Sequence, residues 1–362
     1  MEKEAGVNKS LKIGITMGDV NGIGPEVIMK ALKDQRILQD CTPVVYGSGR
    51  VFGYYRKSLN IQDFVYQTCP SADEVVLRKV NVVNAWSEEV DLQVGQVNAE
   101  GGKCAFQALE HATKDLASGK IDVLVTAPIS KEAMGKAGFP FPGHTEYLAD
   151  LSGEEEALML MVAEQLRVAL VTVHVPLKEV INQLTKEKVV SKIKAFEQSL
   201  KKDFGIIKPK IAVLGLNPHA GENGKMGTEE QEIISPAIQQ ARNSGILAFG
   251  PYPADGLFGS DQRNKFDGIL AMYHDQGLTG FKAVAFEEGV NFTAGLPIVR
   301  TSPDHGTAFD IAGKNQANPQ SMLKAIYTAI DVFRNRQMHR EIHRNPLKVS
   351  PQTRKYGGSR EE

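Results

Sequence analysis

The chain has 362 residues, of which 42% are hydrophobic and 23% are charged, and its formal net charge is −1. This length is typical of two lobes, and the near-neutral charge excludes the basic footprint of a nucleic-acid-binding protein or of a membrane-surface protein. No apolar run is long enough for a transmembrane helix, the N-terminus lacks a signal-peptide core, and the three cysteines form no metal-type spacing. We therefore expect a cytoplasmic enzyme that has neither nucleic-acid nor membrane partners.

Short apolar segments rich in β-branched residues predict the buried strands of a largely parallel sheet. Helical patterns lie between them, and this alternation predicts α/β layers. The predicted strands are residues 12–16, 43–46, 80–85, 122–126, 168–173, 210–216 and 267–272, and the predicted helices include residues 24–32, 102–118, 146–151, 177–203 and 228–243.

The first predicted strand leads into a glycine-rich segment, TMGDVNGIGPEV, at residues 16–27. Pro25 suits the first position of a helix, so the segment predicts a turn followed by a helix. Its glycines do not have the G-x-G-x-x-G spacing, so the usual argument for a Rossmann dinucleotide site does not apply. An ordinary backbone turn is the alternative.

A second turn is predicted in the segment FPFPGHTEYL, residues 139–148. Thr145 can cap the helix that follows, and His144 lies at its start. Free N–H groups at a helix N-terminus, together with His144 and Thr145, could bind an anion. An ordinary capped turn is the alternative for this segment as well.

Three histidines, His174, His219 and His274, each follow a predicted strand. Ligands of α/β proteins bind beyond the carboxyl ends of the strands, so these positions favour a functional role. A lone histidine there usually caps or packs, but if the three strands are neighbours, three imidazoles converge and could bind Zn²⁺, Co²⁺ or a similar cation. Asp275, next to His274, could orient a ligand histidine or act as a turn residue.

Three polar residues, Lys282, Asn291 and Arg300, are evenly spaced among short apolar segments further along the chain. Arginine can bind a carboxylate or phosphate through two hydrogen bonds, which makes Arg300 a candidate anion ligand. Surface charge is the alternative for each residue taken singly.

The segment DHGTAFDIAGK, residues 304–314, is the second glycine-rich segment of the chain. Gly306 permits close backbone approach, His305 could stack on an adenine, and Asp310 could lie near a ribose. The pattern indicates a candidate dinucleotide site.

Seven motifs in this order resemble those of the 4-hydroxythreonine-4-phosphate dehydrogenase family of bacterial vitamin B6 synthesis. The family is related to isopropylmalate and isocitrate dehydrogenases, which bind the dinucleotide without the Rossmann spacing. The resemblance covers residues 12–330, and Val20-Asn21 stands where many relatives carry Pro-Ala. The motifs are ITMGDVNGIGPEV, VTAPISKEAM, FPGHTEYLA, TVHVPL, LNPHAGENG, MYHDQGL and RTSPDHGTAFDIAGK.

The resemblance implies a two-lobed, three-layer α/β/α subunit with its active site in the cleft between the lobes. We expect residues 1–130 and 281–362 to form the dinucleotide-binding lobe, and residues 131–280 to form the lobe for metal, substrate and dimerisation. A homodimer is implied, with active sites at its interface, so the metal ligands need not come from one subunit.

The resemblance also assigns roles to individual residues. One divalent cation (Zn, Mg or Co) and NAD or NADP are the implied cofactors, and Asp275 or Lys282 is the candidate catalytic base. The implied metal ligands are His174, His219 and His274; the substrate contacts are His144, Thr145, Lys282, Asn291 and Arg300; and the expected cofactor contacts are His305, Gly306, Thr307 and Asp310.

The implied activity is NAD-dependent oxidation and decarboxylation of 4-phosphooxy-L-threonine to 3-amino-2-oxopropyl phosphate, CO₂ and NADH. D-Threonate or D-erythronate 4-phosphate is an alternative substrate. A phosphate acyltransferase is an alternative from another class, although it has no use for three strand-end histidines. A non-catalytic metal-binding protein is a third alternative, and the complete set of substrate-contact candidates argues against it.

Overall fold

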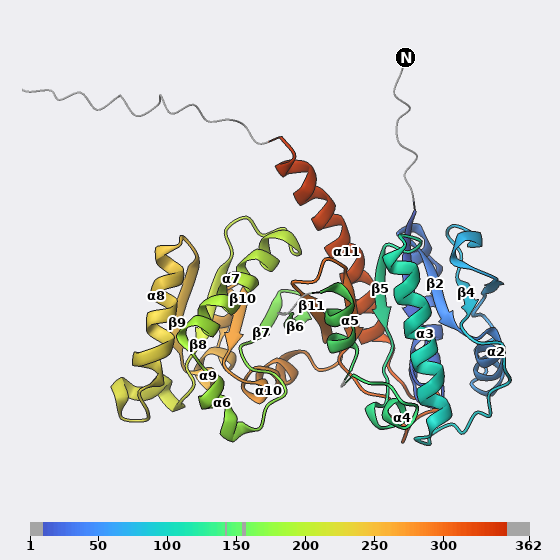
Figure 1. Cartoon of the computed structure of the whole chain (residues 1–362), viewed down its shortest axis with the longest axis horizontal. Helices are drawn as coiled ribbons and strands as arrows, with labels where there is room; N and C mark the ends of the chain where they lie inside the picture. The colour runs from blue at the N-terminus through green and yellow to red at the C-terminus, as the bar shows by residue number, and fades with distance from the viewer. Residues whose placement is uncertain (1–9, 142, 154–156, 346–362) are drawn as a thin grey trace, which may run out of the picture.

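The computed structural model describes residues 10–141, 143–153 and 157–345. The strands of these residues form one 12-stranded sheet in the order β3-β4-β2-β1-β5-β12-β11-β6-β7-β10-β8-β9. Figure 1 shows the sheet running through both lobes of the molecule. The strands are β1 (Leu11–Thr16), β2 (Cys41–Gly47), β3 (Gln67–Cys69), β4 (Asn81–Asn84), β5 (Val123–Thr126), β6 (Leu158–Ala163), β7 (Leu166–Leu170), β8 (Lys210–Leu214), β9 (Leu247–Tyr252), β10 (Gly268–Ala271), β11 (Val290–Ala294) and β12 (Arg300–Pro303).

The sheet is parallel on its two flanks and antiparallel at its centre. β6 pairs antiparallel with β7 and with β11, and β11 pairs antiparallel with β12. All other strand pairs are parallel. The continuous apolar segments predicted this for the pairs among β1, β2, β4, β5, β7, β8 and β10, whereas β3, β9 and β12 were not predicted as strands. The largely parallel sheet is therefore confirmed for the flanks, and the antiparallel centre joins the two lobes.

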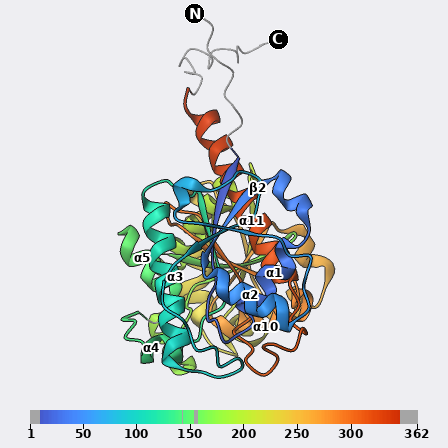
Figure 2. The ribbon, with the colours of Figure 1, turned by 90° about the vertical axis from the view of Figure 1, so that its right-hand side faces the viewer.

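Helices cover both faces of the sheet. In Figure 2, α3 lies on one side of the first strands, and α1 and α11 lie on the other side. The three-layer α/β/α prediction is thus confirmed. The helices are α1 (Gly24–Leu32), α2 (Gly49–Ser58), α3 (Ala99–Ala117), α4 (Lys131–Lys136), α5 (His144–Ser152), α6 (Leu177–Gln183), α7 (Lys186–Lys202), α8 (Ser235–Asn243), α9 (Ala254–Phe258), α10 (His274–Ala285) and α11 (Gln320–His343), with shorter turns η1 (Gln35–Gln39), η2 (Ala72–Glu74), η3 (Pro218–Gly224), η4 (Glu230–Ile234) and η5 (Asp261–Lys265). No helix in this part of the chain is long and apolar enough to cross a membrane.

Two predicted helices differ from those observed. The predicted helix 177–203 is two helices, α6 and α7, because Thr185 caps α7 by accepting a hydrogen bond from Lys188 N at 3.2 Å. The predicted helix 228–243 begins with the π-helical turn η4, and only then continues as α8. Single π-helical turns are frequent at functional sites.

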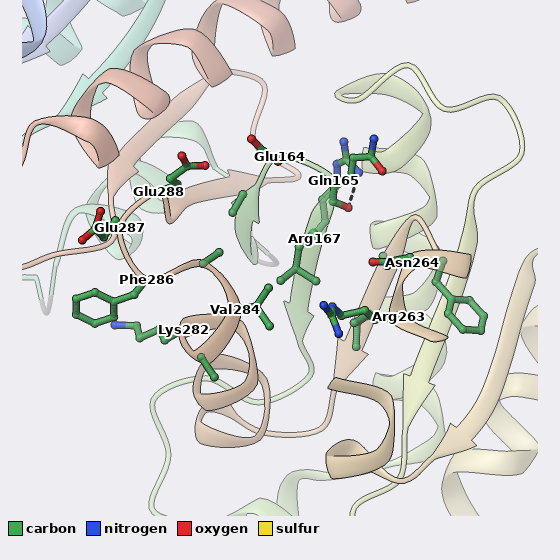
Figure 3. Close-up of a pocket in the computed structure, with 17 residues that line it drawn as sticks. Glu164, Gln165, Arg167, Arg263, Asn264, Lys282, Val284, Phe286, Glu287 and Glu288 are labelled. Atoms are coloured by element: carbon green, nitrogen blue, oxygen red, sulfur yellow. Dashed lines mark hydrogen bonds between the residues drawn. The ribbon is translucent and has the colours of Figure 1, made fainter. Parts of the chain in front are cut away.

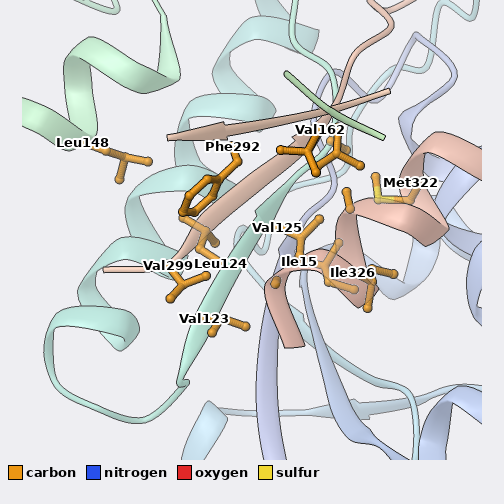
Figure 4. Packing of buried hydrophobic residues seen from close by; sticks show 14 of the residues in the cluster. Ile15, Val123, Leu124, Val125, Leu148, Val162, Phe292, Val299, Met322 and Ile326 are labelled. Carbon is orange, nitrogen blue, oxygen red and sulfur yellow. The ribbon is translucent and has the colours of Figure 1, made fainter. Parts of the chain in front are cut away.

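The core between β1, β5 and α11 is apolar and fully buried. Figure 4 shows Ile15 and Val125 from the strands packing near Met322 and Ile326 of α11. Burial of side chains of this size stabilises the fold by roughly 1.5–3 kcal/mol each. The strand ends that carry the polar residues therefore project from a rigid support.

An ion pair joins the two lobes near the end of α7. Asp203 accepts a hydrogen bond from Nε of Arg336, which lies on α11, at 2.6 Å, and both side chains are buried. Nη1 of Arg336 also donates to the carbonyl oxygen of Ile298 at 2.9 Å. The lobe boundaries at residues 130 and 280 stay a prediction, and the second of them falls inside α10.

Candidate active site

The three strand-end histidines lie at one edge of the sheet. β10 pairs in parallel with β7 on one side and with β8 on the other, so the carboxyl ends of the three strands are adjacent. His174 follows β7, His274 is the first residue of α10 after β10, and His219 lies in η3 after β8. The ring centroids of His174 and His274 are 5.9 Å apart. The adjacency on which the metal-site hypothesis depends is thus present.

Two polar side chains hold these strand ends together. Oγ1 of Thr172 donates a hydrogen bond to the carbonyl oxygen of Met272 at 2.8 Å, which joins the end of β7 to the end of β10. Gln276 accepts from Met272 N at 2.8 Å and donates to the carbonyl oxygen of Gly215 at 2.6 Å. Gln276 therefore joins the end of β10 to the end of β8.

The His219 loop has an unusual backbone that a buried carboxylate supports. Residues 219–223 all have positive φ, and only one of them is glycine. Such conformations cost energy and persist where the surroundings hold them. Glu230, buried in η4, accepts hydrogen bonds from Leu216 N and Asn217 N, both at 2.7 Å. It thereby anchors the chain immediately before His219.

Carboxylates lie beside two of the histidines. Nδ1 of His274 is 2.7 Å from Oδ1 of Asp275, and Nδ1 of His174 is 3.8 Å from Oε1 of Glu146. A carboxylate on Nδ1 leaves Nε2 free as a metal ligand. Within the residues that the structure describes, however, no group of three His, Cys, Asp or Glu side chains is close enough to hold a metal ion.

A cavity of about 500 Å³ lies beside His174, between the antiparallel centre of the sheet and α5. It brings together four of the residues that the sequence singled out. These are His144, His174, Asn291 and Arg300. The cavity lies beside the strands from β5 to β7 in the sheet order, which is where the two predicted lobes meet.

Arg300 is a buried cation in the wall of this cavity. Its Nε and Nη2 donate to Oγ1 of Thr126 at 3.1 and 2.7 Å, and its Nη1 donates to Oγ1 of Thr293 at 3.4 Å. Burial lowers the pKa of Arg300 to about 10, and the negative charge of Glu146 opposes this shift. Arg300 therefore keeps its positive charge at neutral pH.

His144 is held by Arg300. Nη2 of Arg300 is 3.3 Å from Nδ1 of His144, and a guanidinium can only donate, so Nδ1 accepts and the proton lies on Nε2. Burial, followed by the charges of Arg300 and Lys131, lowers the pKa of His144 well below its usual value. Among the described residues, Nε2 of His144 and Oδ1 of Asn291 are buried without a hydrogen-bond partner. These two atoms give the cavity a buried donor and a buried acceptor that are free to bind a ligand.

Two charged residues of the cavity were not predicted as site residues. Lys131 and Glu146 both line it, and they bring an ammonium and a carboxylate to the same space. The positive charge of Lys131, after burial, also lowers the pKa of His174. Lys131 follows β5 at its carboxyl end, which is the signal by which the sequence could have indicated it.

Lys282 lies elsewhere. Its Nζ is 3.2 Å from Oδ2 of Asp304, and Lys282 lines a separate cavity of about 720 Å³ that includes the first residues of β7 and β10. Figure 3 shows Lys282 beside Phe286, with Arg167 and Arg263 further along the same cavity. Within one chain the structure therefore does not bring Lys282 to His144 and Arg300. Thr145 lies in α5, but its side chain is outside the described part of the chain.

The two glycine-rich segments contact each other. Ile23 N donates to the carbonyl oxygen of Thr307 at 3.0 Å, and a Cβ on Gly22 would come within 2.8 Å of that oxygen. A side chain at position 22 would therefore separate the segments. Asp310 is exposed, and a Cβ on Gly306 would meet open space. These residues do not line the cavity of Arg300, and their cofactor role stays a prediction.

Residues 39–329 match the family model described as "Pyridoxal phosphate biosynthetic protein PdxA". The chain belongs to this family. A 4-hydroxythreonine-4-phosphate dehydrogenase of Bacteroides thetaiotaomicron is 50% identical over 339 residues, covering 93% of each chain. The crystal structure of a 4-hydroxythreonine-4-phosphate dehydrogenase from Klebsiella pneumoniae has a TM-score of 0.77 and 36% identity, and the match covers 90% of this chain and 98% of that one.

The PdxA relatives do not all carry the same substrate name. A protein of Oceanobacillus iheyensis, 43% identical over 330 residues, is provisionally named a D-threonate 4-phosphate dehydrogenase. The match covers 90% of this chain and 99% of that one. Membership of the PdxA family therefore leaves substrate identity to be argued from the site.

Proposed function

We propose that this chain is an NAD(P)-dependent dehydrogenase that oxidises and decarboxylates 4-phosphooxy-L-threonine to 3-amino-2-oxopropyl phosphate and CO₂, in pyridoxal phosphate biosynthesis. The observation that carries the proposal is the cavity in which the buried, charged Arg300 lies beside the neutral His144 and Asn291. A buried cation to which the described residues supply no carboxylate partner suits an anionic substrate. The names of the relatives from Bacteroides and Klebsiella support the same activity.

The histidines fit a divalent metal in their chemistry. Nδ1 of His274 is hydrogen-bonded to the carboxylate of Asp275, the carboxylate of Glu146 lies 3.8 Å from Nδ1 of His174, and His219 lies after the neighbouring strand. Neutral imidazole nitrogens suit Zn²⁺ or Co²⁺ better than Mg²⁺. When bound, such a cation would supply Lewis-acid chemistry that polarises the substrate hydroxyl and stabilises negative charge on its oxygen.

The residues of the cavity hold the substrate for this chemistry. Nε2–H of His144 donates to an anionic oxygen, and the charge of Arg300 stabilises that anion. Oδ1 of Asn291, an acceptor, receives a hydrogen bond from the hydroxyl or amino group of the substrate. Asp275 remains the candidate base, because its carboxylate is exposed at the same edge of the sheet as the three histidines.

We infer that the metal site is shared between two subunits of a homodimer. One chain brings His174 and His274 together, while the described residues contain no complete three-ligand group. A site completed by a second copy of the chain would supply the missing ligand. Lys282 is remote from Arg300 within one chain. In a shared site, Lys282 would contact the substrate that is bound to the partner subunit.

Subunit complementation tests the shared site. His219→Ala and His274→Ala should each be inactive and bind metal weakly. After subunit exchange between the two variants, mixed dimers should regain part of the activity, because one of their two sites then has every ligand. If a mixture shown to contain mixed dimers regains no activity, the inference of a shared metal site is wrong.

Side-by-side assays test the reaction itself. We expect substrate-dependent formation of NADH or NADPH and of CO₂, with the highest kcat/KM for 4-phosphooxy-L-threonine. A higher kcat/KM for D-threonate or D-erythronate 4-phosphate would identify that compound as the substrate, and the chain would still be a dehydrogenase. Absence of reduced dinucleotide, with acyl transfer to phosphate instead, would identify the acyltransferase alternative.

A further inference from the structure

Lys131 places an uncommitted ammonium group in the cavity of Arg300. Ser130 caps α4 by accepting a hydrogen bond from Ala133 N at 3.1 Å, and Lys131 is the first residue of that helix. The Cε of Lys131 is 3.6 Å from the position that a Cβ on Gly143 would take. The side chain therefore passes over the start of α5, next to His144.

The ammonium of Lys131 has no partner within the part of the chain that the structure describes. The other lysine of the same helix is paired: Nζ of Lys136 is 2.8 Å from Oε1 of Glu132. Lys282, for which the family resemblance implied a substrate contact, is paired with Asp304. Lys131 is exposed, so it also keeps its side-chain freedom and its hydration in the unliganded chain.

Arg300 cannot bind a phosphate dianion alone. A guanidinium has five N–H groups, and Arg300 directs one from Nε, two from Nη2 and one from Nη1 at Thr126, His144 and Thr293. One N–H therefore remains for a ligand. His144 contributes a second through Nε2. The oxygens of a phosphate group accept more hydrogen bonds than the two that Arg300 and His144 can donate.

We propose that Lys131 is a substrate-binding residue whose ammonium group binds the phosphate of the substrate, together with Arg300 and His144. The identity of the substrate in this statement rests on the proposed function. An ammonium group is a compact charge with three donors, which suits a phosphate, whereas a carboxylate is better matched by a planar guanidinium. The charge of Lys131 already acts on this space, because it lowers the pKa of His144 and of His174.

Lys131→Met is the test variant, and Lys136→Met on the same helix is its matched control. Titration of the wild-type homodimer with inorganic phosphate should show binding that Lys131→Met weakens by on the order of 10- to 100-fold, the range expected for loss of one charged hydrogen bond. Lys136→Met should bind phosphate as the wild type does. Lys131→Arg should restore part of the affinity, since it restores the charge.

Kinetics distinguish phosphate binding from other roles. With 4-phosphooxy-L-threonine, Lys131→Met should lower kcat/KM chiefly by raising KM. With unphosphorylated 4-hydroxy-L-threonine, the two proteins should have similar kcat/KM. An equal loss with both substrates would overturn the proposal, because Lys131 would then act on the carboxylate or on the reaction itself.

The phosphate titration needs no turnover, so it separates this inference from the proposed function. A wild type that binds phosphate through Lys131 but does not oxidise 4-phosphooxy-L-threonine would overturn only the proposed function. Absence of phosphate binding in the wild type, or equal binding by Lys131→Met, would overturn the role of Lys131. Unchanged thermal unfolding of Lys131→Met would show that any loss is not a folding defect.

Discussion

Nη2 of Arg300 lies 3.3 Å from Nδ1 of His144, so a buried guanidinium determines which nitrogen of the neighbouring imidazole carries the proton. Both side chains are buried, and the two residues are 156 positions apart in the chain. The pair presents Nε2–H of His144 as a donor and keeps that ring neutral. A neutral imidazole can donate a hydrogen bond to a substrate oxygen without placing a second positive charge beside Arg300.

Arg300→Met should therefore raise the pKa of His144, because one of the two positive charges that oppose protonation of His144 is removed. We expect kcat/KM to fall by on the order of 10²-fold or more, since a buried anion loses a charged partner. An NMR titration of the His144 ring measures the pKa directly. Arg334→Met, which removes an exposed arginine of α11, is the control and should leave that pKa unchanged.

Asp275→Asn should weaken metal binding without removing a metal ligand. Asp275 holds Nδ1 of His274 at 2.7 Å, and loss of such a carboxylate typically lowers metal affinity by about 10- to 100-fold. Competition against a chelator of known affinity measures the change in the full-length protein. Asp261→Asn, an exposed carboxylate of the same lobe, should not alter the affinity. If both variants bind metal equally well, Asp275 does not orient His274.

Glu230→Gln should loosen the His219 loop. The carboxylate accepts hydrogen bonds from two backbone N–H groups, and a neutral amide would accept them less strongly. We expect the free energy of unfolding to fall by about 1–3 kcal/mol and the metal affinity to fall with it. Faster hydrogen exchange at the amides of Leu216 and Asn217 would locate the effect. Glu232→Gln, at an exposed position of the same turn, should show none of these changes.

Asp19 should make the stability of the wild type depend on pH. Burial raises the pKa of this carboxyl to about 6, and a hydrogen bond from Asn21 N partly offsets the rise. Because the folded pKa is above the unfolded value of 3.8, the folded chain binds more protons between these values. The stabilisation that comes from this proton binding is complete below the unfolded pKa and is lost as pH rises through about 6. The free energy of unfolding then falls by on the order of 3 kcal/mol.

Asp19→Asn cannot titrate, so this loss between pH 4 and about 6 should be absent from the variant. Denaturant unfolding of both proteins across that pH range measures the difference, and Asp91→Asn controls for removal of an exposed carboxylate. Parallel pH profiles for wild type and Asp19→Asn would show that Asp19 is ionised in the folded chain throughout.

Much of the local structure was readable from the sequence because it depends on nearby residues. The apolar segment before Thr16 and the Gly24-Pro25 start predicted β1 and α1 almost to the residue. The same patterning placed His174, His219 and His274 after strands. Helix breaks were missed where a single side chain decided them, as Thr185 does between α6 and α7.

The sequence by itself determined which residue types stand after the predicted strands, namely three histidines and the acid beside His274, and it singled out Arg300 as a candidate anion ligand. Only the tertiary structure decided that β10 lies between β7 and β8, so that the histidines share an edge. It also decided that Lys131, and not Lys282, shares the cavity of Arg300 within one chain. Strand order and ion pairing are long-range contacts selected by burial and packing of the whole chain, and no local pattern encodes them.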